Sequence, residues 1–240
     1  MSLYSTPRKE TGNQQPPAQN PTHDEENNYH IGEEIANAVT HAVGGYLGAA
    51  AVVLLVVFAI WSDEQVVWKI VSGSIFGATI IILYSASTVY HAVTNVQVKE
   101  ICRACDQMAI YALIAGTYTP FCLVTLRQTN LGLAWTVFGI VWGLTVLGIM
   151  FKVLIKHQFK YITTITYLLM GWCCLLIIRP LYYSLELGGI LWLVLGGILY
   201  SLGVVFFLWQ KLPFNHTIWH IFVLAGTACH FFCILYYVMS

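Results

Sequence analysis

The run AVGGYLGAAAVVLLVVFAIW, residues 42–61, decides the fold class because none of its 20 residues is charged. A helix needs about 20 apolar residues to cross the hydrocarbon core of a bilayer. Seven such runs follow one another with short polar breaks between them: 42–61, 67–91, 106–125, 131–151, 161–179, 187–209 and 215–238. They are continuous and longer than the roughly 9–11 alternating residues of a barrel strand. The sequence therefore predicts an all-α integral membrane protein, a bundle of seven transmembrane helices.

The composition of the whole chain agrees with a membrane location. Charged residues make up 9% of the 240 residues, against about 25% in soluble globular domains, and the mean hydropathy is +0.71. The 11 basic and 11 acidic residues cancel to a net charge of zero. A neutral chain has no basic field with which to hold a phosphate backbone, so nucleic acid is excluded as a partner.

The N-terminal residues 1–32 differ from the rest of the chain. They include four prolines, a Gln/Asn-rich stretch and very few apolar side chains. Such a segment cannot bury enough surface to offset the entropy of its chain. We expect a disordered polar tail over 1–32 and a seven-helix transmembrane domain over 33–240.

The distribution of Lys and Arg predicts an orientation in the membrane. With the N-terminus in the cytoplasm, eight of these residues lie inside and three outside. The inside set is Arg8, Lys9, Lys99, Arg103, Lys152, Lys156, Lys160 and Lys211, and the outside set is Lys69, Arg127 and Arg179. Because basic residues concentrate on the cytoplasmic side, we expect a multi-pass protein of the plasma or inner membrane with its C-terminus outside.

Three histidines lie at the predicted cytoplasmic ends of the second and seventh runs. His216 and His220 are four residues apart, one turn of a helix, so both imidazoles can reach one ion. His91, at the end of the second run, would supply a third nitrogen. Three histidines with an open fourth position are typical of catalytic zinc, and a ligand set of imidazoles favours zinc over magnesium or calcium. We expect His91, His216 and His220 to bind Zn2+.

Other polar residues are predicted to lie at the same membrane face. Asp106 opens the third run, where it would manage the proton of a metal-bound water, and Ser87 precedes His91 by one turn. Glu34, Asn37 and His41 share one helical face and are candidates for orienting the ligands. An alternative for these three is an ordinary helix start with an acid at its positive end.

Several further features receive structural interpretations. His230 is ten residues beyond His220, too far to share the ion, and is expected to be a hydrogen-bonded core residue. The single Cys102-x-x-Cys105 motif is a weak signal without a second pair. Glycines four residues apart, at Gly44 and Gly48, Gly73 and Gly77, and Gly139 and Gly143, predict close helix packing. Pro120 predicts a disturbed third helix. His23, His30 and His157 are given no role.

The order of these polar residues resembles the hemolysin III family, which belongs with the progestin and adipoQ receptors and is distantly related to alkaline ceramidases. The segments DQMAIYALIAGTYTP, residues 106–120, and HTIWHIFVLAGTACHFF, residues 216–232, are similar to its signatures. The resemblance implies seven helices with a cytoplasmic N-terminus, zinc on His91, His216 and His220, and Ser87 and Asp106 beside the metal-bound water. Gln107 departs from the pattern, since bacterial relatives often carry a second histidine there.

Three functions are compatible with these features. The first is a zinc-dependent hydrolase that attacks the amide or ester carbonyl of a membrane lipid such as a ceramide. The second is a receptor or membrane-homeostasis protein without turnover, in which zinc is a structural link between helices. The third, a pore-forming cytolysin, follows from the family name, but the fourth, fifth and sixth runs carry almost none of the polar residues that a pore needs. The oligomeric state is open.

Overall fold

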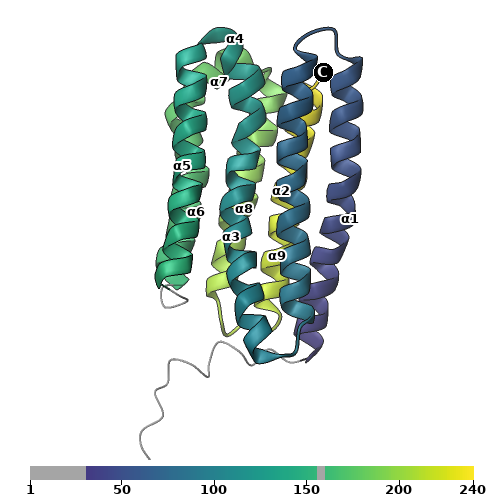
Figure 1. Cartoon of the computed structure of the whole chain (residues 1–240), viewed down its shortest axis with the longest axis vertical. Coiled ribbons are helices and arrows are strands. Elements are labelled where there is room, and N and C mark those ends of the chain that lie inside the picture. The colour runs from purple at the N-terminus through teal and green to yellow at the C-terminus, as the bar shows by residue number, and fades with distance from the viewer. Residues whose placement is uncertain (1–30, 156–159) are drawn as a thin grey trace, which may run out of the picture. The chain divides into compact units, whose positions relative to one another are not determined.

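Seven helical stretches run side by side in the computed structural model of the chain, which describes residues 31–155 and 160–240 (Figure 1). Each stretch is long and apolar enough to cross a membrane, and the described residues form no strand. The main helices are α1 (Ile31–Trp61), α2 (Val66–Ala92), α3 (Val96–Pro120), α5 (Leu131–Ile155), α6 (Lys160–Trp172), α8 (Leu187–Leu208) and α9 (Asn215–Tyr237). The predicted fold class is confirmed.

Two of the seven stretches change their helical type, and a proline lies beside each change. α3 ends at Pro120 and continues as a π-helix, η1 (Phe121–Leu126), and a short α4 (Arg127–Thr129). α6 continues as a 3-10 helix, η3 (Cys173–Ile177), and α7 (Ile178–Ser184), which contains Pro180. Proline has no N–H for the carbonyl four residues back and its ring crowds that carbonyl. The disturbance predicted at Pro120 is therefore present as a switch from α to π geometry.

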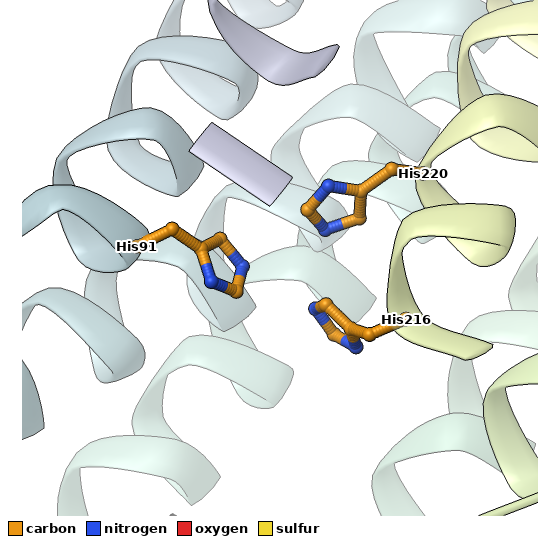
Figure 2. Close-up of side chains that lie close together, drawn as sticks. All are labelled: His91, His216 and His220. Carbon is orange, nitrogen blue, oxygen red and sulfur yellow. The ribbon is translucent and has the colours of Figure 1, made fainter. Parts of the chain in front are cut away.

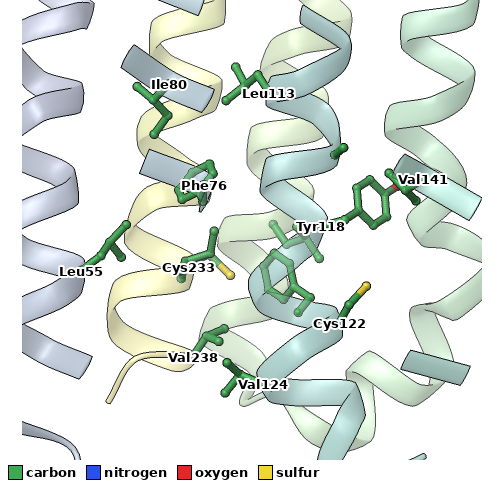
Figure 3. Close-up of a cluster of buried hydrophobic side chains, with 14 of the residues drawn as sticks. Leu55, Phe76, Ile80, Leu113, Tyr118, Cys122, Val124, Val141, Cys233 and Val238 are labelled. Carbon is green, nitrogen blue, oxygen red and sulfur yellow. The ribbon is translucent and has the colours of Figure 1, made fainter. Parts of the chain in front are cut away.

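The third stretch lies at the centre of the bundle. In its most apolar window 83% of the residues are buried, more than in any of the other six. α2, α5 and α6 pack against α3, while α1 packs between α2 and α9. Buried side chains from several helices meet around α3, among them Phe76, Tyr118 and Cys233 (Figure 3). Many large apolar side chains on the outer helices are exposed, as expected for surfaces that contact lipid.

Two of the predicted glycine pairs, one on α1 and one on α5, differ in their surroundings. A Cβ at Gly44 would lie 2.9 Å from Cγ of Tyr84, and one at Gly48 would lie 2.7 Å from Ile80, so α1 and α2 approach closely because these residues are glycine. Gly139 and Gly143 have nothing within 4 Å of such a Cβ. The prediction of close packing was correct for the α1 pair and wrong for the α5 pair, whose face of the helix contacts no other part of the described chain.

Two of the helices begin well before their predicted apolar runs. α1 begins at Ile31 and α3 at Val96, about ten residues before the predicted run in each case. Hydropathy marks only the part of a helix that crosses the hydrocarbon, whereas helical hydrogen bonding continues into polar residues. The predicted tail, residues 1–32, lies outside the described residues except for Ile31 and Gly32, which belong to α1. His23, His30 and His157 also lie outside them.

The ends of α1, α2, α3 and α9 that carry the predicted site residues lie at one end of the bundle, at the bottom of Figure 1. α1, α3 and α9 begin there and α2 ends there, because successive helices are antiparallel. We call this the histidine end, since it carries the ends of α2 and α9 that hold His91, His216 and His220.

Candidate metal centre

His91 from α2 and His216 and His220 from α9 point toward one another at the histidine end (Figure 2). One ligand nitrogen from each ring lies within 4.8 Å of those of the other two. The ring centroids are 5.1 Å apart for His91 and His216, 5.1 Å for His91 and His220, and 4.6 Å for His216 and His220. His91 and His220 are buried and His216 is partly buried. The three predicted ligands therefore form one cluster that can hold a metal ion.

His91 is fixed by a carboxylate from α1. Its Nδ1 lies 2.7 Å from Oε2 of Glu34, and Nζ of Lys99 donates to Oε1 of the same carboxylate at 2.9 Å. A carboxylate only accepts, so Nδ1 carries the proton and the lone pair of His91 is on Nε2. That nitrogen is buried and has no hydrogen-bond partner among the described residues. This is the tautomer that a metal ligand requires.

His220 is fixed by the next turns of α1. Its Nδ1 lies 3.3 Å from the Asn37 carbonyl and 3.3 Å from Oγ1 of Thr40. Since the carbonyl only accepts, Nδ1 donates, and Nε2 keeps its lone pair. The ring of His41 stacks on that of His220, with centroids 3.5 Å apart and planes inclined by 11°. α1 thus sets both the rotation and the tautomer of His220.

A further polar contact joins α1 to α9 beside the cluster. The hydroxyl of Thr217 donates to Oδ1 of Asn37 at 2.6 Å, and both side chains are buried. One helix turn closer to the start of α1, Oε1 of Glu33 accepts from the backbone N–H of Phe214 at 2.8 Å. The first three turns of α1 therefore reach both helices that carry the histidines.

Asp106 lies on α3 beside the end of α2. The hydroxyl of Ser87, one turn before His91, is close enough to the Asp106 carboxyl group to interact with it. The geometry of this contact is not that of a full hydrogen bond, and the Ser87 hydroxyl forms none with any other described residue. Ser87 is fully buried and Asp106 is half-buried. Asp106, predicted to manage a proton, is therefore adjacent to Ser87, which lies one helical turn before the predicted ligand His91.

The sequence-predicted residues fall into two sets. Those at the histidine end lie together: the three histidines, Glu34, Asn37, His41, Ser87 and Asp106. His230 lies elsewhere, with Nε2 3.2 Å from the carbonyl of Leu193, so the expectation of a hydrogen-bonded core residue is confirmed. Cys102 and Cys105 are not bonded to each other.

Three contacts at the cluster were not predicted from the sequence: Thr40 with His220, Thr217 with Asn37, and Lys99 with Glu34. Thr40 and Thr217 each adjoin a predicted site residue, His41 and His216, and that adjacency was the available signal. In the sequence, Lys99 is one of several charged residues between the second and third apolar runs. Its role as partner of Glu34 depends on how the starts of α1 and α3 come together in the folded chain, which no local pattern reveals.

The donor set fits zinc. Imidazole is a good ligand for Zn2+, and three protein ligands leave room for a fourth, exchangeable one. The lone pair of His91 Nε2 is buried without a partner among the described residues, which is costly unless a ligand binds it. The contact of Glu34 with His91 is the carboxylate–histidine arrangement common around metals.

Comparison with known proteins gives one consistent set of relatives. The family described as "Haemolysin-III related" matches residues 29–231. The "Hemolysin-3 homolog" of Bacillus subtilis (strain 168) is 47% identical over 86% of this chain and 95% of its own, and the "Hemolysin-3" of Bacillus cereus is 44% identical over 87% and 93%. The human "Monocyte to macrophage differentiation factor" is 32% identical over 85% of this chain and 84% of its own.

Proposed function

Because this chain belongs to the haemolysin III-related family, we propose that it is a membrane-embedded zinc hydrolase that cleaves an amide or ester bond of a lipid. The histidine cluster would hold the zinc and would lie at the cytoplasmic face of the membrane. The observation that carries the proposal is the convergence of three imidazoles whose orientation is set by a carboxylate and a carbonyl on α1.

The chemistry of the cluster supports hydrolysis. A zinc ion, when bound, supplies a Lewis acid that activates water and polarises a carbonyl group. His91, His216 and His220 would hold it. Glu34 would keep His91 in the ligating tautomer, and the Asn37 carbonyl would do the same for His220. Thr40 and His41 would help to hold the orientation of the His220 ring.

Asp106 is the residue best placed to move a proton in this reaction. It lies beside Ser87, one turn from His91, and a carboxylate can take a proton from an attacking water and return it to a leaving amine or alkoxide. Ser87 would orient the Asp106 carboxyl group. We propose Asp106 as the acid–base residue and Ser87 as its positioning partner.

The position of the cluster supports a lipid substrate. His220 is five residues beyond the start of α9 at Asn215, about 7.5 Å along the helix axis, which is a depth where headgroups of a bilayer join their acyl chains. The outer surfaces of the helices are rich in exposed Leu, Ile and Val, so a substrate with acyl chains can approach from the bilayer. A ceramide-like amide has its scissile bond at the junction of head and chains.

The test compares turnover and metal content in the same preparations. The purified chain in detergent is assayed for bound zinc and for fatty-acid release from ceramides and from ester lipids. Wild type should bind zinc and release fatty acid, while Asp106→Asn should retain the zinc and lose turnover by about 100-fold or more. The expected retention follows because Asp106 is not among the three ligands.

A non-catalytic role for the metal is the second candidate, because the cluster links α2 to α9 and is braced by α1. Zinc retained by wild type with no product from any lipid would favour this receptor or homeostasis role over hydrolysis. A pore is the third candidate, and it would be supported by ion flux from liposomes that contain the chain beyond that from empty liposomes.

A further inference from the structure

A second group of polar side chains lies deeper in the bundle than the histidine cluster. Thr227 is seven residues beyond His220 on α9, about 10 Å along the helix. Its hydroxyl donates to the Val223 carbonyl at 2.9 Å, and it accepts from Tyr84 of α2 and Tyr200 of α8, each at 2.7 Å. The single Thr227 proton is committed to Val223, so both tyrosines are the donors.

Tyr84 joins this hydroxyl group to the histidine cluster. Its ring is almost completely buried and meets the ring of His41 edge to face, with centroids 4.9 Å apart and planes inclined by 66°. His41 in turn stacks on His220 at 3.5 Å. A continuous series of contacts therefore runs from Thr227 through Tyr84 and His41 to His220.

Close packing leaves the Tyr84 ring little freedom. Gly44, one turn after His41 on α1, allows α1 to approach the ring so closely that a Cβ there would lie 2.9 Å from Tyr84 Cγ. The hydroxyl at the other end of the side chain is held by Thr227. The ring is thus fixed at both ends, and it presents a rigid surface to His41.

We propose that Tyr84 is a positioning residue for the metal centre: its anchored ring holds His41 against His220 and so sets the direction in which His220 presents Nε2. The inference rests on the proposed metal site and adds to it a residue that lies on α2 outside the ligand set. Neither nitrogen of His41 has a hydrogen-bond partner among the described residues. Ring contacts with Tyr84 and His220 are therefore what holds its orientation.

The chain contains a matched control for this role. Tyr200 donates to the same Thr227 oxygen at the same distance as Tyr84 and also helps to join α9 to its neighbours. Its ring contacts His230 instead of His41, with centroids 5.5 Å apart. If both tyrosines act only by bonding to Thr227, removing either ring should have the same effect on metal binding. If Tyr84 acts through His41, only the removal of Tyr84 should change metal binding.

The experiment titrates Co2+ into the metal-stripped full chain in detergent, because the visible absorption of this ion reports its coordination geometry. Tyr84→Leu should raise the dissociation constant about tenfold, as is typical when support for a ligand is removed, and should change the shape of the absorption bands. Tyr200→Leu should stay within about twofold of wild type. His41→Ala should reproduce the effect of Tyr84→Leu, and the double variant should add nothing further.

Equal shifts for Tyr84→Leu and Tyr200→Leu, an unchanged spectrum for Tyr84→Leu, or additive effects in the double variant would overturn the inference. If Tyr84→Leu does not fold, Tyr84→Phe and Tyr200→Phe decide, since each loses only the hydroxyl. A band shift in the Tyr84 variant alone supports positioning, and equal behaviour of the two overturns it. A wild type that binds no Co2+ overturns instead the proposed metal site itself.

Discussion

At the scale of single residues, His91 and His220 are each committed to α1 through Nδ1, which leaves Nε2 of both for a common ligand. If the three histidines bind one zinc ion together, removing any one of them should remove the metal. His91→Ala, His216→Ala and His220→Ala should each reduce bound zinc from about one ion per chain to near zero, because two imidazoles hold zinc weakly. The measurement is elemental analysis of purified protein.

His230→Ala is the control for that series. His230 is also a buried histidine of α9, but its ring contacts Tyr200 and the Leu193 carbonyl instead of the cluster. This variant should keep its zinc even if its thermal stability falls. Loss of zinc in the His230 variant equal to that in the other three would indicate a general failure of folding and would refute the assignment of ligands.

Glu33 and Glu34 are neighbouring acids on α1. Comparing their variants separates the loss of the contact with His91 from the loss of one negative charge. Glu34 accepts from His91 and Lys99, whereas Glu33 accepts from the backbone of Phe214. Glu34→Gln should weaken zinc binding about tenfold, because the carboxylate makes Nε2 of His91 a stronger ligand for the metal. Glu33→Gln, which removes the same charge, should change the affinity by less than about twofold. Competition with a zinc-binding dye measures both, and similar losses in the two variants would contradict the role of Glu34.

At the scale of helices, α1 is the element that organises the histidine end, although it contributes none of the three ligands. Its side chains contact His91, Thr217 and His220 within three turns. Its position depends on Gly44 and Gly48, where α2 comes too close for a side chain. The close crossing of α1 and α2 thus places both the polar contacts and the Tyr84 ring.

Alanine at Gly44 tests this crossing. A methyl group there would lie 2.7 Å from Leu224 Cδ2 and 2.9 Å from Tyr84 Cγ, and overpacking of this kind costs about 1–3 kcal/mol. Gly44→Ala should therefore lower the Tm in detergent and weaken zinc binding. Gly139→Ala, on a face of α5 with nothing within 4 Å, should leave the Tm equal or higher. A Tm for Gly44→Ala at or above that of wild type would show that the crossing tolerates a side chain.

At the scale of the whole molecule, the sequence was sufficient to predict the fold class and the cluster of three histidines, for definite physical reasons. A bilayer requires long apolar helices, so hydropathy locates them, and the i, i+4 spacing of His216 and His220 places two ligands on one helical face. The contacts of Glu34 with His91 and of Tyr84 with His41 join residues from different helices. They depend on the rotation and crossing of packed helices, which no local pattern encodes. The π-helix after Pro120 is likewise set by packing around a proline.

The orientation of the bundle is the remaining prediction at this scale. The distribution of Lys and Arg in the sequence predicts that the N-terminus is cytoplasmic. With α1 beginning at the histidine end, this end would face inward and the site would have access to the cytoplasmic leaflet. Cys105 is exposed on α3 near the histidine end, and Asp63 is exposed in the connection between α1 and α2 at the opposite end. In intact cells a membrane-impermeant maleimide should label Asp63→Cys and should leave Cys105 unlabelled until the cells are permeabilised. Cys105→Ser identifies the signal of the native thiol. Labelling of Cys105 in intact cells would place the histidine end outside, and the substrate would then have to come from the outer leaflet.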